Sequence, residues 1–83
     1  KENIKKYDGL GLEDLNQFEV KQYDYIEDFG GKKDKIGLIA EDLPQELTEE
    51  KDGVLHVDLY GLVSVMITAI QELSDKVEKL EER

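Results

Sequence analysis

The sequence predicts an α+β domain in which a small sheet of short strands, with short helices, precedes one long C-terminal helix. Three observations lead to this prediction: a length of 83 residues, turn signals between short apolar runs, and a change to a helical hydrophobic period after Asp58. We divide the chain into a globular part, residues 1–58, and an oligomerisation helix, residues 59–83, which together form one domain.

Composition limits how such a chain is stabilised and what it binds. A chain of 83 residues that folds alone buries about 60 to 65% of its unfolded surface, and with no cysteine it has no disulfides. Oligomerisation is therefore the simplest source of further stability. The 21 acidic and 11 basic residues give a net charge of -10, which repels nucleic acid and anionic membranes. We expect neither as a partner.

Short apolar runs between turn residues predict the first elements of the globular part. We expect a helical turn near residues 12–17 and an alternating strand over 18–26, with a bulge where the alternation changes phase. The glycines and charges of residues 28–34 predict a turn that joins this strand to the next. The next strand, over 35–40, is expected to be buried because of its apolar composition.

The second half of the globular part contains stronger turn signals. Pro44 predicts a turn or the start of a helix, and Asp52 with Gly53 predicts a tight turn before a strand at 54–57. His56 lies within that strand and is the single histidine. We interpret it as a packed or interfacial residue rather than a catalyst.

An apolar heptad repeat in the C-terminal helix is the strongest signal in the sequence. Asp58 is a favourable N-cap, and heptad positions a and d after it are apolar over three heptads without proline. Leu62, Ile67 and Ala69 widen the apolar face of the first half, which we expect to dock on the globular part as well as on neighbours. Residues after Gln71 are expected to form a bare coiled coil. The a and d positions form the predicted oligomer interface, or seam: Leu59, Val63, Met66, Ile70, Leu73, Val77 and Leu80.

Charges and side-chain shape give partial information about orientation and strand number. In a parallel neighbour Lys76 faces Glu81, and within one helix Glu72 with Lys76 and Asp75 with Lys79 are favourable pairs. β-Branched residues at a with leucine at d favour two strands, so the pattern alone leans towards a dimer. An ordinary amphipathic helix packed on a monomeric core is the alternative.

Five blocks stand along the chain in a specific order and spacing: Lys1-Glu2-Asn3-Ile4, Val20-x-x-Tyr23-x-Tyr25, residues 36–43, Asp52-Gly53 with Val57-Asp58, and Leu62 through residues 69–73. Together they resemble the endosialidase-type intramolecular chaperone auto-processing domain. This family lies at the C-termini of phage tail fibres, tailspikes and neck appendages, and its members look like trimers. The resemblance covers nearly the whole chain and implies a parallel trimeric coiled coil, hence a homotrimer, in place of the dimer.

The resemblance also implies a function. Such a domain gathers three chains, assists folding of the fibre or spike part upstream, and then releases itself by autoproteolysis. The protein would be a phage virion precursor, made in the host cytoplasm. Family members are cut before the serine of Ser-Asp-x-x-x-Lys-x-x-Ile, and Lys1 and Ile4 match the end of this motif.

The resemblance therefore assigns Lys1 as the catalytic base of a serine-lysine endopeptidase. A lysine whose pKa is lowered by burial can take the proton of a serine hydroxyl and make it nucleophilic. The partner serine would precede Lys1, since Ser64 and Ser74 belong to the helix and do not match the motif. The fragment as it stands is thus expected to be inactive, and an ordinary frayed terminal lysine is the alternative interpretation.

Other candidate sites are weaker. Glu41 and Asp42 could support the processing site from another chain, or they could form an ordinary solvated turn. We expect no cofactor and no metal, because no second histidine is present and the twelve-residue calcium-loop pattern is missing. A non-processing coiled-coil tether is the main alternative function. An independent hydrolase lacks a recognisable set of nucleophile, base and orienting residue.

Overall fold

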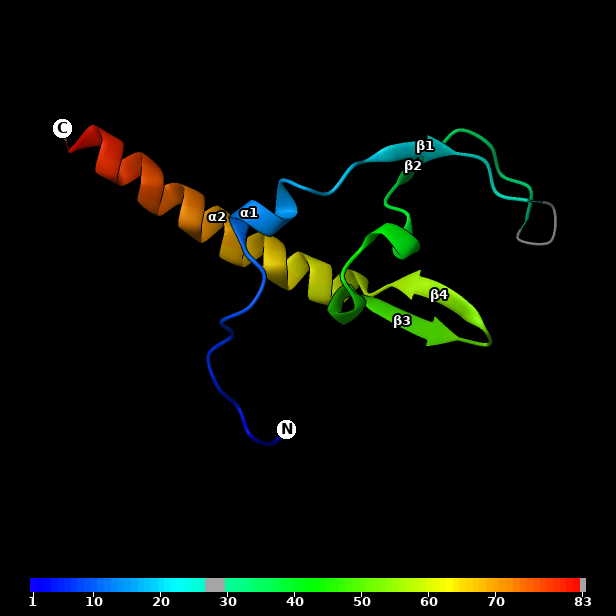
Figure 1. Cartoon of the computed structure of the whole chain (residues 1–83), viewed down its shortest axis with the longest axis horizontal. Helices are drawn as coiled ribbons and strands as arrows, with labels where there is room; N and C mark the ends of the chain where they lie inside the picture. Colours follow the sequence, from blue (N-terminus) through cyan, green and yellow to red (C-terminus); the bar gives the residue numbers. More distant parts are fainter. Residues whose placement is uncertain (27–29, 83) are drawn as a thin grey trace.

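The computed structural model describes residues 1–26 and 30–82. A long helix dominates it, and the shorter elements gather along the first half of that helix (Figure 1). The predicted α+β class is confirmed in the form of two small antiparallel hairpins and a long C-terminal helix. The elements in order are α1 (Leu12–Leu15), β1 (Lys21–Tyr23), β2 (Lys35–Gly37), the 3-10 turns η2 (Ala40–Asp42) and η3 (Gln45–Leu47), β3 (Thr48–Lys51), β4 (Val54–Val57) and α2 (Leu59–Glu81).

Strands β1 and β2 form an arm that projects from the rest of the molecule (Figure 1). They are antiparallel, with Lys21 opposite Gly37. The prediction of a buried strand over 35–40 was wrong, because β2 ends at Gly37 and Ile36 is 73% exposed. The arm is a two-stranded ribbon in which alternate side chains face solvent, and burial begins only at Ala40, in η2. The predicted strand over 18–26 is confined to Lys21–Tyr23, and the bulge predicted near Lys21 and Gln22 was wrong, because these residues pair in regular register with Gly37 and Ile36. The predicted turn over 28–34 lies partly outside the described residues, which omit 27–29.

Strands β3 and β4 form the second hairpin, and its turn is the one predicted. Asp52 and Gly53 have φ values of 53 and 77°, the left-handed pair that a tight two-residue hairpin turn requires. Pro44 immediately precedes η3, which confirms it as a helix start. His56 is exposed on β4, opposite Glu49, so it is not packed within the chain.

Helix α2 starts as its sequence predicts, since the Asp58 carboxylate accepts a hydrogen bond from the Gly61 N–H at 3.1 Å. Its 23 residues extend for about 35 Å. The core lies against the first half of the helix, where Leu47, Leu62 and Val65 are buried together. Partly buried apolar side chains surround them: Leu10, Leu15, Phe18, Leu38 and Val57. Among the described residues no helix combines the length and apolar character needed to cross a membrane.

Candidate functional site: the exposed seam and the N-terminal segment

All seven predicted seam residues are exposed along one side of α2. Their side chains are between 42 and 68% exposed, from Met66 at the lower limit to Leu59 at the upper. Within the chain, therefore, nothing among the described residues covers the seam. The alternative of an ordinary amphipathic helix packed on a monomeric core agrees with the structure in one respect, since α2 does pack on the chain's own core, but it does so through a different face and leaves the seam exposed.

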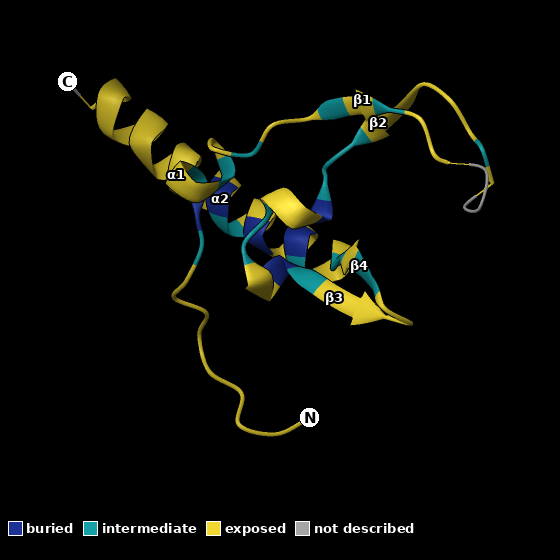
Figure 2. Ribbon diagram, turned by 45° about the vertical axis from the view of Figure 1, so that its right-hand side comes forward, coloured by how far each residue is buried: buried dark blue, intermediate teal, exposed yellow. Residues whose placement is uncertain are grey.

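That face, the docking stripe, comprises Leu62, Val65 and Ala69, which are 8, 4 and 1% exposed. These residues occupy heptad positions g and c, each one residue before a seam position, so the stripe lies about 100° around the helix from the seam. The sequence pattern indicated Leu62 and Ala69 correctly, but it also included Ile67, which is 53% exposed, and did not indicate Val65, which belongs to neither a nor d. In Figure 2 the buried residues of α2 lie in its first half, towards the globular part, and the last turns are exposed.

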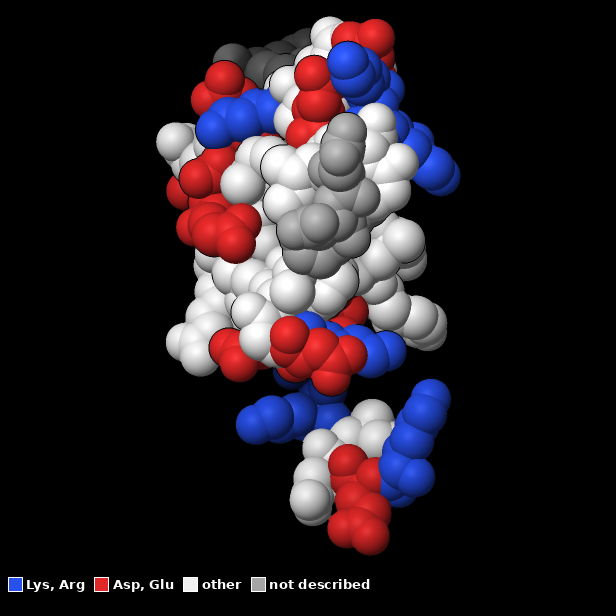
Figure 3. Space-filling model, turned by 90° about the vertical axis from the view of Figure 1, so that its right-hand side faces the viewer, with Lys and Arg blue, Asp and Glu red and all other residues white. Residues whose placement is uncertain are grey.

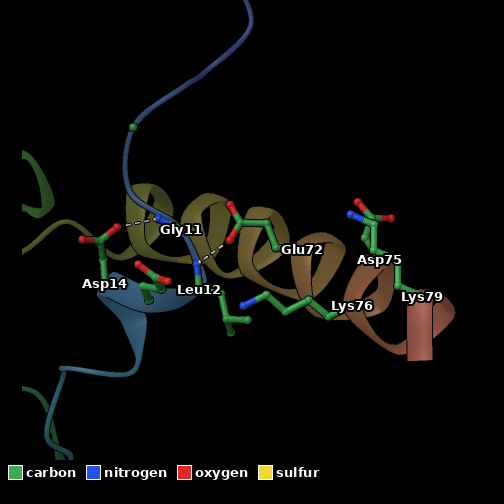
Figure 4. A pocket seen from close by; sticks show the side chains of 9 residues that line it. Gly11, Leu12, Asp14, Glu72, Asp75, Lys76 and Lys79 are labelled. Atoms are coloured by element: carbon green, nitrogen blue, oxygen red, sulfur yellow. Dashed lines mark hydrogen bonds between the residues drawn. The ribbon is translucent and has the colours of Figure 1, made fainter.

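Helix α1 extends the docking stripe beyond Ala69. It packs along α2, and the Leu12 N–H donates a hydrogen bond of 2.9 Å to the Glu72 carboxylate (Figure 4). The pairing of Glu72 with Lys76 expected from the sequence is not an ion pair. Within the described part of the chain, the single side-chain pair close enough for a salt bridge is Lys21 with Asp42. The Glu72 contact joins residues 60 positions apart, and no local pattern could have indicated it.

Lys1, the predicted catalytic residue, lies at the end of an extended segment. Residues 1–9 are all exposed, and Ile4 of the motif is 83% exposed. The segment runs away from the body of the molecule and carries lysine side chains (Figure 3). In the single chain Lys1 thus lacks the burial that activates a lysine base.

Glu41 and Asp42, the predicted supporting carboxylates, lie on η2 and are exposed. In Figure 1 the N-terminus lies well away from the segment around residue 40 that forms η2, so one chain does not bring these carboxylates to Lys1. Instead, Asp42 binds the Lys21 ammonium at 2.8 Å and ties the base of the β1–β2 arm to η2. If Glu41 or Asp42 supports a processing site, it must act on Lys1 of another chain.

The Lys21 ammonium stabilises the arm in a pH-dependent way. Its hydrogen bond to Asp42, followed by the charge of Asp42, raises the pKa of Lys21 above the ordinary value of 10.5. Since the folded-state pKa is the higher one, the stabilisation is complete below pH 10.5 and is lost as the pH rises through the folded value. We expect amide exchange in β2, corrected for its intrinsic pH dependence, to accelerate above this pH in the wild type. In Lys21→Gln that additional acceleration should be absent; an identical profile would contradict the role of the pair.

Two tyrosines stabilise the arm further. The rings of Tyr23 and Tyr25 meet edge to face at 5.3 Å between centroids, with their hydroxyls 3.4 Å apart. This hydrogen bond, with some burial, raises the pKa of Tyr23. The Tyr23 hydroxyl also lies above Gly37, where an added Cβ would approach it to 3.1 Å. The absence of a side chain at Gly37 therefore permits the close approach of the Tyr23 ring.

Comparison with known proteins decides the family. The sequence model described as "Chaperone of endosialidase" matches residues 1–52. The chain belongs to this family. The resemblance found from the sequence blocks is thereby confirmed, and the family is also named as a peptidase family.

Two curated relatives of this chaperone of endosialidase domain are phage proteins. They are the long tail fiber proteins Gp37 of Enterobacteria phages M1 and Ox2, and each is 32% identical over 88 residues. The match includes 94% of this chain but spans only 35% of the length of either relative. No solved structure matches the chain.

Proposed function

We propose that the chain is a C-terminal intramolecular chaperone that trimerises, assists folding of an upstream fibre or spike protein, and is then released by autoproteolysis. The observation that carries the proposal is the seam of α2, a continuous apolar stripe exposed beside a separate, buried docking stripe. Family membership and the tail fibre relatives support the chaperone role. An upstream tail fibre part would be its folding client.

Burial of the seam supplies the driving force for assembly. A fully buried Leu, Ile, Val or Met contributes about 1.5 to 3 kcal/mol relative to an exposed one, and each chain offers seven such side chains. The seam lies beside the globular part rather than beneath it, so several helices can meet without displacing their own cores. The pattern of β-branched a residues alone would allow two strands; the family resemblance leads us to propose three, in parallel.

Assembly of the helices provides a mechanism for chaperoning. A parallel coiled coil holds three copies of the preceding chain close together, which raises their effective concentration to the millimolar range expected for short linkers. The entropic cost of bringing three upstream segments into register is then met by the coiled coil. A domain of this kind would accelerate formation of a trimeric fibre without remaining part of the fibre.

Release requires the chemistry of the Lys1 motif. In the precursor, the hydroxyl of a serine five residues before Lys1 would attack the carbonyl carbon of the residue preceding it, while the Lys1 amine accepts the hydroxyl proton. The C–N bond to the serine nitrogen then breaks, the leaving amine takes up that proton, and water hydrolyses the resulting ester to a free carboxylate and the serine hydroxyl. The exposure of Lys1 in the free chain implies that the upstream segment or a neighbouring protomer must bury it before cleavage. Glu41 or Asp42 of another protomer is the proposed source of carboxylate support.

A coiled-coil module that trimerises and tethers without processing is the alternative. The exposed position of Lys1 favours it. Both functions use the same seam. They differ in the fate of the peptide bond before the serine.

The chaperone role is tested by producing the upstream fibre segment with and without this domain. We expect a soluble, protease-resistant trimer of the upstream segment only when the domain is fused to its C-terminus. The matched control is a fusion to an unrelated trimeric coiled coil of similar length. If the upstream segment folds equally well alone, the chaperone role is contradicted; if the control substitutes fully, the domain acts as a tether.

A further inference from the structure

A long-range hydrogen bond connects α2 to the N-terminal part of the chain, and its acceptor is the Glu72 carboxylate. Leu12 is the first residue of α1, and its N–H has no intrahelical acceptor. The Glu72 carboxylate accepts this hydrogen bond through Oε2 at 2.9 Å, while the adjacent Gly11 N–H donates to Asp14 within the turn (Figure 4). Helix α2 therefore satisfies a backbone group of the segment that leads towards Lys1.

Gly11 lies directly against this contact. Its φ of -148° is ordinary extended backbone, so the conformation does not require glycine. An added Cβ would, however, collide with the Glu72 carboxylate group. That carboxylate is the end of a flexible side chain, so a larger residue at position 11 would displace it from the Leu12 N–H without disturbing the turn.

The contact can form only when α2 is helical. Glu72 follows Ala69 on the docking stripe, and only helical geometry aligns the two on one face of α2. Residues 73–82 of this helix are exposed in the single chain, and a helix with little packing is marginal in water. Coiled-coil assembly would stabilise this part of the helix and with it the position of Glu72.

The contact lies beside the last packed residue before the processing motif. Leu10 packs against the core, and residues 1–9 beyond it are exposed. An extended segment of that length spans at most about 30 Å, so the position of residues 10–12 on the molecule limits where Lys1 can lie relative to the seam. The Glu72 hydrogen bond fixes the backbone at this origin, whereas Leu10 fixes it through apolar packing.

We propose that Glu72 is a positioning residue for autoproteolysis, which couples processing at Lys1 to formation of the coiled-coil helix. This proposal rests on the proposed function. Together with the packing of Leu10, Glu72 holds the segment 10–12 on the molecule, so that a precursor in which this part of α2 has unfolded lacks one restraint on the position of Lys1. Cleavage before assembly, which would separate the chaperone from its client too early, is thereby disfavoured.

The test combines amide exchange in the chain with self-cleavage of a precursor that extends upstream through the serine. Glu72→Ala and Gly11→Ala should each accelerate exchange of the Leu12 amide by about fivefold, the effect of one lost hydrogen bond. Each should slow cleavage by about tenfold or more through misplacement of the segment, while leaving the oligomeric mass unchanged. Because they break the same contact, the double variant should cleave no more slowly than either single one.

Two further variants separate positioning from a general effect on stability. Glu72→Gln retains an oxygen acceptor and should restore most of the cleavage rate. Glu78→Ala removes an exposed carboxylate from the same helix and should behave as the wild type. A wild-type precursor that stays intact contradicts the processing part of the proposed function and, with it, the positioning role. Wild-type cleavage with an unchanged rate in Glu72→Ala contradicts the role of Glu72 alone.

Discussion

Replacement of Ile70 by aspartate is expected to abolish assembly of the chain. Ile70 occupies an a position near the middle of α2 and is 62% exposed in the single chain. In a three-stranded seam the substitution would place three carboxylates together without partners. Unpaired buried charges cost several kcal/mol each, in addition to the about 1.5 to 3 kcal/mol of apolar burial lost per chain.

Light scattering across micromolar concentrations measures this effect directly. The wild type should have three times the 9.5 kDa mass of one chain, and the variant the mass of one. Gln71→Asp is the matched control, since it adds the same charge at a neighbouring exposed position outside the seam. A wild type that remains monomeric would contradict trimerisation, and a variant that remains trimeric would refute the heptad assignment. The circular dichroism of the variant shows whether its fold persists.

Replacement of Lys1 by alanine is expected to stop self-cleavage of an extended precursor that includes the upstream serine. Loss of a general base typically reduces a rate by about 10²- to 10⁴-fold, so the uncut precursor should accumulate. Lys1→Arg should be equally inactive, because a guanidinium keeps its proton and cannot serve as a base. Gel electrophoresis over time, with mass spectrometry of the released domain, measures both the rate and the site of cleavage.

Lys5→Ala provides the control, since Lys5 is an exposed lysine of the same segment that lies outside the matched motif positions. It should cleave at the wild-type rate. Cleavage that persists in Lys1→Ala would remove the catalytic role from this residue. An intact wild-type precursor with normal trimers would favour the tether.

The fold was predictable where local chemistry determines it. Asp58 caps α2, Pro44 precedes η3, and Asp52 with Gly53 turns the second hairpin, because each of these residues restricts its own backbone. The arm was less predictable. Apolar composition suggested burial for residues 35–40, but Ile36 faces solvent because no layer of the described structure covers the ribbon.

The candidate site was predictable only where local sequence determines it. A heptad pattern identifies the seam, because helical periodicity places its members on one face regardless of the rest of the chain. It does not identify Val65 or Glu72, whose roles depend on where the globular part and α1 pack against α2. The contact between Leu12 and Glu72 joins residues that are 60 positions apart in the sequence. It depends on tertiary structure, so neither residue spacing nor composition predicts it.

The separation of the seam from the docking stripe makes helix α2 modular. Side chains at a and d specify the number of strands in a coiled coil, whereas Leu62, Val65 and Ala69 hold the protomer together. Substitutions in one set leave the other intact, since the two sets lie about 100° apart on the helix. The stoichiometry of the proposed assembly can therefore diverge, or be redesigned, while the fold of each protomer is retained.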